Sequence, residues 1–70
     1  MEKKEITQQL EFYKKENMKI HIELNNGRFY NGFILEIAGD MLIFDDSSLG
    51  AIPIYFLQVT IVEKYKEKKE

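Results

Sequence analysis

The stretch "LNNGRFYNGF", residues Leu24 to Phe33, decides the fold. It follows the alternating segment "KIHIEL", and Asn26-Gly27 is a strong hairpin signal because a type I′ turn needs positive φ at both central residues. Five residues later, Gly32 interrupts the next apolar run. A glycine inside a strand marks a bend, a bulge or a close backbone approach. The stretch therefore predicts a tight hairpin whose second strand is bent.

The segments around this hairpin predict one helix and a series of short strands. In residues 3–17, Ile6, Leu10 and Tyr13 follow helical spacing, and Asn17 can end the helix because Asn tolerates the left-handed conformation. Between residues 19 and 62 the strands read "KIHIEL", "RFYNGFILEI", "MLIF", "AIPIY" and "LQVTIV". Pro53 cannot donate to a ladder, so we expect it either on an edge strand or on a side whose N–H position faces away from the partner strand.

We therefore expect a mainly β fold, with an N-terminal α-helix followed by a five-stranded, strongly bent antiparallel small barrel of the SH3-like kind. A single domain is expected over residues 1–62, and residues 63–70 read as a charged C-terminal tail.

Composition excludes several classes of protein. Without cysteine the chain has neither disulfides nor thiolate metal sites, and its one histidine offers no metal cage, so no cofactor is expected. No apolar run approaches the roughly 18 residues of a membrane span, and the N-terminus does not resemble a signal peptide. The sequence thus predicts a cytoplasmic chain with no membrane partner.

An enzyme is not expected either. Ser47 and Ser48 share a loop with Asp45 and Asp46, but His21 lies on a distant strand, so spacing supports no nucleophile–base pair. The aspartates fit a solvated, turn-forming loop.

Charge is distributed unevenly along the chain. Residues 1–19 carry five Lys and four Glu (+1), residues 20–62 carry one Arg and five acidic residues (−4), and residues 63–70 carry four Lys and three Glu (+1), which gives the total of −2. Any surface that binds anions must therefore be built mainly from the two terminal segments.

The last two strands carry more apolar side chains than one small barrel interior can take. Surplus apolar surface beside strand edges predicts association with another chain, and the alternative is that the N-terminal helix covers it. The expected interface residues are Ile52, Ile54, Tyr55, Val59 and Ile61.

The segment "FYKKENMKIHIELNNGRFYNGFILEI" resembles the Sm/LSm superfamily, and within it the bacterial RNA chaperones of the Hfq family. The shared pattern is a basic helix end, an alternating strand ending in Asn-Gly, and a glycine five residues further on. The alignment with the family pattern needs no gap from Ile6 to Phe44. One extra residue in the 45–50 loop then brings Tyr55 into line with a tyrosine of the family. The resemblance implies a ring of six or seven subunits, closed by pairing the fourth strand of one subunit with the fifth of its neighbour, that binds RNA.

Some residues match the RNA-binding positions of that family. Lys14, Lys15 and Asn17 stand where Hfq carries a basic rim motif, although two lysines at a helix end are also ordinary solvated residues. Arg28 is predicted to belong to the same RNA-binding rim, and it is adjacent to an aromatic pair that could stack on bases. The stacking candidates are Phe29, Tyr30 and Tyr55.

Other RNA-binding positions of the family are replaced. Phe56 and Leu57 stand in place of a Lys-His pair, Asp40 in place of an aromatic residue, and Glu23 in place of a stacking tyrosine. The Asp and Asn of the general Sm pattern are Ala38 and Leu42.

Two functions follow from this mixture. The first is a homo-oligomeric ring that binds RNA mainly through the basic rim. The second is an Sm-fold module for protein–protein contacts, or a ribosome-associated module that has lost RNA binding, as the weaker similarity to the C-terminal domain of the ribosome-maturation factor RimP suggests.

Overall fold

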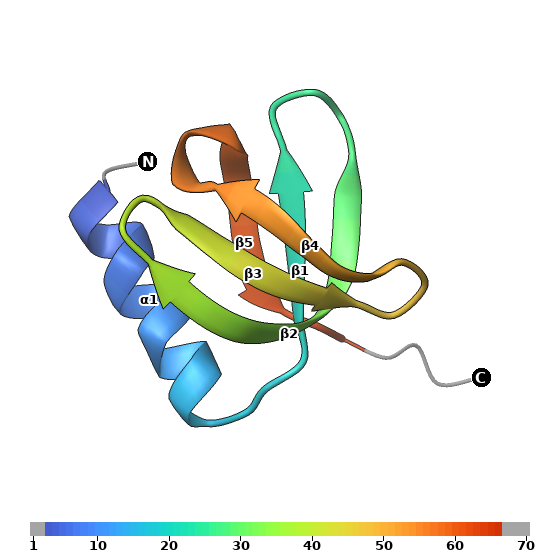
Figure 1. Ribbon diagram of the computed structural model, residues 1–70, viewed down its shortest axis with the longest axis horizontal. Coiled ribbons are helices and arrows are strands. Elements are labelled where there is room, and N and C mark those ends of the chain that lie inside the picture. Colours follow the sequence, from blue (N-terminus) through green and yellow to red (C-terminus); the bar gives the residue numbers. More distant parts are fainter. Residues whose placement is uncertain (1–2, 67–70) are drawn as a thin grey trace.

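The computed structural model of the chain describes residues 3–66. One helix precedes five strands and a short 3-10 turn, as Figure 1 shows. The elements are α1 (Lys3–Lys15), β1 (Ile20–Leu24), β2 (Phe29–Ala38), β3 (Met41–Asp46), β4 (Gly50–Tyr55), η1 (Phe56–Gln58) and β5 (Val59–Lys64). The strands form one antiparallel sheet in the order β4-β3-β2-β1-β5. The mainly β fold expected from the sequence is confirmed.

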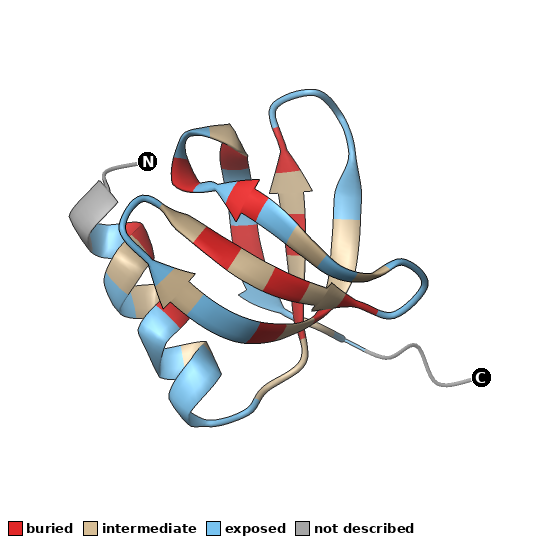
Figure 2. Cartoon of the chain, in the orientation of Figure 1, coloured by how far each residue is buried: buried red, intermediate tan, exposed pale blue. Residues whose placement is uncertain are grey.

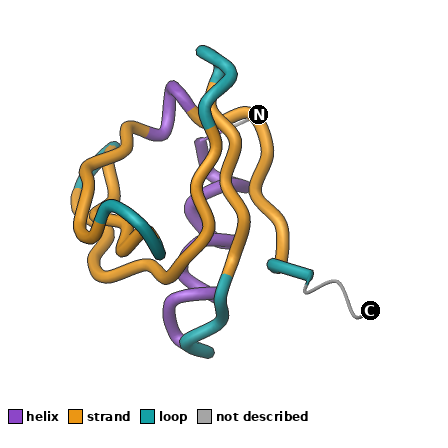
Figure 3. Tube along the Cα trace, turned by 90° about the vertical axis from the view of Figure 1, so that its right-hand side faces the viewer, coloured by secondary structure: helices purple, strands orange, loops and turns teal. Residues whose placement is uncertain are grey.

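Strand β2 bends so that its two halves pair with different strands. Its first residues pair with β1 as far as Gly32, and from Gly32 onward it pairs with β3. A Cβ atom at Gly32 would overlap the backbone carbonyl of Asp45, so only glycine fits where the strands approach. A close backbone approach is one of the three explanations that the sequence offered for this glycine. In the side view of Figure 3 the sheet is strongly curved rather than flat.

The β1–β2 hairpin differs from the type I′ turn expected for Asn26-Gly27. The Gly27 amide donates to the Leu24 carbonyl at 3.0 Å, which makes Asn25 and Asn26 the central residues of the turn. Only Gly27 has positive φ there (88°), and the amide of Leu24 donates to the carbonyl of Arg28 at 2.8 Å. This is a three-residue loop that ends in a left-handed glycine. Gly27 thus follows the two central residues of the turn, whereas the prediction made it the second central residue.

Helix α1 ends where the sequence predicted a left-handed asparagine. Asn17 has φ 52°, its amide donates to the Lys14 carbonyl, and the Met18 amide donates to the Tyr13 carbonyl at 3.0 Å. This pair of bonds is a Schellman motif, which satisfies carbonyls that the helix leaves unpaired. Regular helix stops at Lys15, two residues before the predicted limit.

The core lies between α1 and the concave face of the sheet. Ile20, Ile22 and Leu24 of β1 are buried and alternate with half-exposed residues, as predicted. Ile6 and Leu10 of α1 pack into the same cluster, and Figure 2 shows the alternating burial along the strands. The remaining core residues are Ile34, Leu42, Phe44, Ile54, Phe56, Val59 and Val62.

Both outer strands of the sheet leave one backbone edge open. Pro53 lies in β4, which is an edge strand, one of the two placements expected for it. The other edge, β5, continues to Lys64, two residues past the predicted domain limit, and the Tyr65 amide then donates to the Lys19 carbonyl at 3.0 Å. Residues 63–65 thus join the folded part rather than a tail. Residues 67–70 of the predicted tail lie outside the described residues.

Within residues 3–66, no helix has the length and apolar character required to cross a bilayer.

Candidate functional site

The lysines of the predicted rim lie next to acidic side chains. Lys14 and Lys15 are exposed in the last turn of α1, and they line a hollow together with Glu11, Glu36 and Ile37. The rim is therefore a mixed patch with two cations and two carboxylates. One copy of it provides only a weak attraction for a polyanion.

Arg28 does not join this rim. Strand β1 begins just after the helix end and runs to the hairpin that carries Arg28, and its five residues span about 17 Å. Figure 1 shows the hairpin and the C-terminal end of α1 at opposite ends of the molecule. Of the predicted rim residues, the fold brings together Lys14, Lys15 and Asn17.

The three predicted stacking residues are also divided. Phe29 and Tyr30 start β2, and Phe29 is exposed while Tyr30 packs partly against the core. Tyr55 pairs with Met41, beside the β2–β3 turn that follows the far end of β2. Tyr55 is therefore separated from the aromatic pair.

The predicted interface residues fall into two groups. Ile54 and Val59 are 1% and 6% exposed, because they belong to the core of this chain, so they do not supply the outer apolar surface assigned to them. Ile52 is half-buried, whereas Tyr55 and Ile61 are 51% and 41% exposed. Leu57, between the two edge strands, is exposed more fully still, at 88%. Part of the predicted outer apolar surface is therefore present, and it lies on the edge strands β4 and β5 and on the turn between them.

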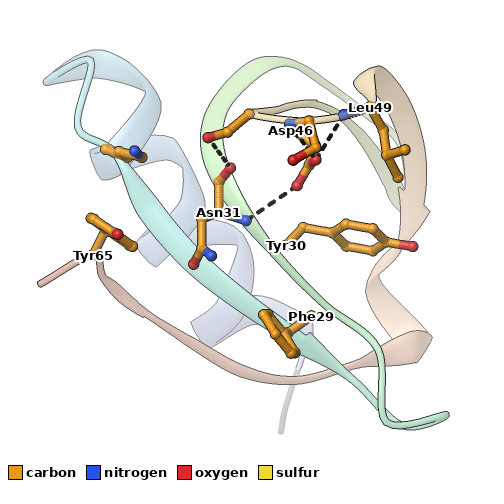
Figure 4. Close-up of a pocket in the computed structure, with 9 residues that line it drawn as sticks. Phe29, Tyr30, Asn31, Asp46, Leu49 and Tyr65 are labelled. Atoms are coloured by element: carbon orange, nitrogen blue, oxygen red, sulfur yellow. Dashed lines mark hydrogen bonds between the residues drawn. The ribbon is translucent and has the colours of Figure 1, made fainter. Parts of the chain in front are cut away.

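A cavity of about 410 Å³ lies where β2 begins, and Figure 4 shows its lining. Phe29, Tyr30 and Asn31 come from β2, and the loop from Asp46 to Leu49 covers one side. Lys19 and Tyr65 complete it, with the Lys19 ammonium 4.4 Å from the centre of the Tyr65 ring. Lys19 and Tyr65 carry no sequence signal that would place them at a site, since they meet only through the pairing of β1 with β5.

Asp46 holds the loop that covers this cavity. Its carboxylate accepts hydrogen bonds from the amides of Ser48 (2.8 Å), Leu49 (2.9 Å) and Asn31 (3.3 Å). Burial alone would raise the pKa of Asp46, but these three donors outweigh it and lower the pKa below its ordinary value. Asp46 is turn-forming, as expected, but it is buried rather than solvated.

His21 forms a polar cluster on the outer face of β1. One ring nitrogen lies 2.9 Å from the Glu23 carboxylate and the other 2.6 Å from the Asn31 side-chain oxygen. The hydrogen bond to Glu23 is the main cause that raises the pKa of His21; burial opposes it, and Asn31 and the charges of Glu23 and Glu63 add to the rise. The hydroxyl of Ser47 donates to the Asn31 carbonyl rather than to the histidine. In the described part of the chain, no group of three or more His, Asp or Glu residues could hold a metal ion.

Comparison with known proteins identifies the fold. No protein-family model matches the chain, and no curated protein matches it in sequence. Among solved structures, it matches the 1.55 Å crystal structure of the pleiotropic translational regulator Hfq with a TM-score of 0.72. The chain has the Sm fold of Hfq.

The match covers 81% of this chain and 93% of the Hfq chain, at 18% sequence identity. The helix, the bent second strand and the two edge strands all belong to the Hfq-like fold, which agrees with the resemblance found in the sequence. At this identity the match establishes the fold and leaves the function to the residues. The weaker similarity to RimP stays a prediction.

Proposed function

We propose that this protein is a cytoplasmic, non-enzymatic RNA-binding protein of the Hfq type, which works as a homo-oligomeric ring. The observation that carries the proposal is an Hfq-like Sm fold whose sheet has open edges at β4 and β5. Open edges present unpaired N–H and C=O groups that can pair with another strand.

Assembly would join the β4 edge of one copy to the β5 edge of the next. Each copy then uses two different edges, so the contact is head-to-tail and closes into a ring when the rotation between copies allows it. The exposed side chains of Tyr55 and Ile61 lie on these two strands, where pairing would cover them. A ring of six or seven subunits is the expected form.

RNA binding would rest on repetition of the rim. Lys14 and Lys15 are balanced by Glu11 and Glu36 in a single copy, so a monomer should bind RNA weakly. A ring repeats the lysine pair around its circumference, and several weak contacts to one strand raise the overall affinity through effective concentration.

A protein–protein module is the second candidate function. The mixed charge of the rim hollow and the carboxylate of Glu23 beside His21 on β1 favour a protein surface over an RNA surface. Leu57, almost fully exposed between the edge strands, would also suit a protein contact. In this second candidate function, the protein still assembles into a ring, but the ring binds a protein partner instead of RNA.

The test compares two double charge reversals of the same size. Lys14→Glu with Lys15→Glu should weaken binding of a fluorescent single-stranded RNA at low salt by about tenfold or more, measured by anisotropy. Lys3→Glu with Lys4→Glu, in the first turn of the same helix, makes the same charge change about 15 Å from the rim. It should have a smaller effect. Parental binding should also fall steeply as salt rises.

Equal losses in the two reversed variants would mean that only net charge matters, and the rim would have no special role. No RNA binding by the parent at low salt, together with recovery of a defined protein partner, would favour the protein module.

A further inference from the structure

Both ring nitrogens of His21 face hydrogen-bond acceptors. Nδ1 lies 2.6 Å from the Oδ1 atom of Asn31, and Nε2 lies 2.9 Å from the Glu23 carboxylate. An imidazole that donates from both nitrogens carries two protons and a positive charge. We propose that His21 and Asn31 form a proton-sensitive switch, in which loss of the Nδ1 proton turns over the Asn31 side-chain amide and reverses the hydrogen-bonding groups that it presents to the cavity. The inference does not depend on the proposed function.

The surroundings of His21 favour the doubly protonated ring. Titratable side chains approach it from its own strand and from the end of the chain on β5, whereas β2 contributes the uncharged Phe29 and Asn31. The titratable groups are the carboxylates of Glu23 and Glu63, the exposed ammonium groups of Lys64 and Lys66, and the phenol of Tyr65. Water screens the exposed lysines, while the hydrogen bond to Glu23 is the largest cause of the raised pKa of His21.

The two acceptors differ in how they respond when the ring loses a proton. The Glu23 carboxylate has no proton to donate, so its bond requires a hydrogen on Nε2, and a bond to a charged acceptor is the stronger of the two. The proton that leaves is therefore the one on Nδ1. The lone pairs of Nδ1 and of the Asn31 Oδ1 atom would then face each other across 2.6 Å, which is repulsive.

Asn31 can relieve this repulsion with its side chain alone. Its backbone amide donates to Asp46, and its backbone carbonyl accepts from the amide and the hydroxyl of Ser47, so the main chain is held in place (Figure 4). The last torsion of an Asn side chain is broad and roughly twofold. A half turn exchanges Oδ1 and Nδ2, so that the amide donates to Nδ1 and the hydrogen bond is restored with a neutral ring.

The half turn changes what the cavity offers to a ligand. Asn31 lines the cavity beside Phe29, whose ring lies 5.6 Å from the His21 ring. With Oδ1 toward the protonated ring, the Nδ2 group points away from His21 and can donate to a ligand. After the half turn the oxygen takes that place and can only accept. Because histidine titrates near neutral pH, a small change of pH selects between the two states.

The test is nuclear magnetic resonance of the isotope-labelled full chain between about pH 5 and about pH 9. His21 is the only histidine, so its ring signals are unambiguous. At the acid end, both ring nitrogens should have the shifts of protonated nitrogens. At the alkaline end, Nδ1 alone should move to the range of an unprotonated nitrogen, and the side-chain N–H protons of Asn31 should show stronger nuclear Overhauser contacts to the ring Hε1. Both changes should have the same midpoint.

Three substitutions separate the switch from a general effect of charge. Asn31→Asp introduces a carboxylate that cannot turn a donor toward the ring, so the midpoint of the His21 titration should rise by about one pH unit. Glu23→Gln removes the charge that favours the imidazolium, and the midpoint should fall by about one pH unit. Glu5→Gln makes the same charge change in the first turn of α1, on the other side of the sheet, and should leave the midpoint unchanged.

Two results would overturn the inference. If the His21 ring titrates while the Asn31 amide keeps one orientation, the pair is a fixed structural contact and not a switch. If Nε2 loses its proton while Nδ1 stays protonated, the change occurs at Glu23 and not at the cavity. Should Asn31→Asp lose the dispersed spectrum of a folded chain, the spectra of the unaltered chain still decide between these results and the expected one.

Discussion

The rim and the cavity both offer cations to a ligand, but the fold builds them in different ways. Lys14 and Lys15 are neighbours in the chain and share one helix turn, so their grouping needs only the helix. Lys19 and Tyr65 come together only because β1 pairs with β5, while Phe29 and Asn31 arrive on β2. The rim therefore depends on local structure, and the cavity depends on the whole sheet.

This difference has a consequence for affinity. The rim lysines are exposed next to Glu11 and Glu36, where water and salt screen them, so the patch gains strength only by repetition. The cavity combines few charges with a loop that part-buried hydrogen bonds of Asp46 hold against β2, so its shape is fixed within one copy. Substitutions that affect one region and spare the other can test this contrast.

Gly32→Ala should have the largest effect on stability, because it disturbs the bend in β2 that positions both regions. The added Cβ would overlap the Asp45 backbone, and strands cannot separate without loss of pairing, so we expect a cost of about 3 kcal/mol in the free energy of unfolding. Urea denaturation measures it. Gly27→Ala meets open space and only the strain of positive φ (88°), so it should cost about 1 kcal/mol. Equal costs would contradict the steric explanation.

Asp46→Ala should break the cavity and spare the rim. It removes the acceptor for three backbone amides, which we expect to cost about 2 kcal/mol and to loosen the 46–49 loop. Amide exchange should speed up at Ser48 and Leu49. Asp45→Ala, a loss of the same charge one residue earlier, serves as the control. Unchanged exchange at Ser48 and Leu49 would show that the loop does not need the carboxylate.

The two regions also differ in how much of their structure could be predicted from the sequence. The left-handed Asn17, the close approach at Gly32 and the edge position of Pro53 were predictable because each depends on one residue's backbone chemistry. The Lys19–Tyr65 contact was not, because it requires the register between β1 and β5. For the same reason, strand pattern alone could not show that Ile54 and Val59 face inward.

Asn17→Ala should affect the rim end and spare the cavity. Alanine in the left-handed conformation costs about 1 kcal/mol, whereas Asn17→Gly should be close to neutral because glycine adopts that conformation freely. Thermal unfolding compares the two variants. The backbone amide shifts of Ser48 and Leu49 should be the same in both variants, and a change there would show that the two regions are coupled.

The smallest expected effect is a pH dependence of stability that comes from His21. Its pKa is raised in the folded state, so its contribution is fully present below about pH 6.5 and is lost as the pH rises through the raised value. His21→Gln should flatten this part of the curve of unfolding free energy against pH. A slope that persists in the variant would assign the effect to another group.

The most direct test of the proposed function is light scattering coupled to size exclusion, with absorbance recorded at 260 and 280 nm. The chain has four tyrosines and no tryptophan, so bound nucleic acid would stand out clearly at 260 nm. We predict a particle of six or seven subunits that carries RNA from the cell and releases it at high salt. A monomer free of nucleic acid at every concentration would contradict both the ring and its RNA-binding role.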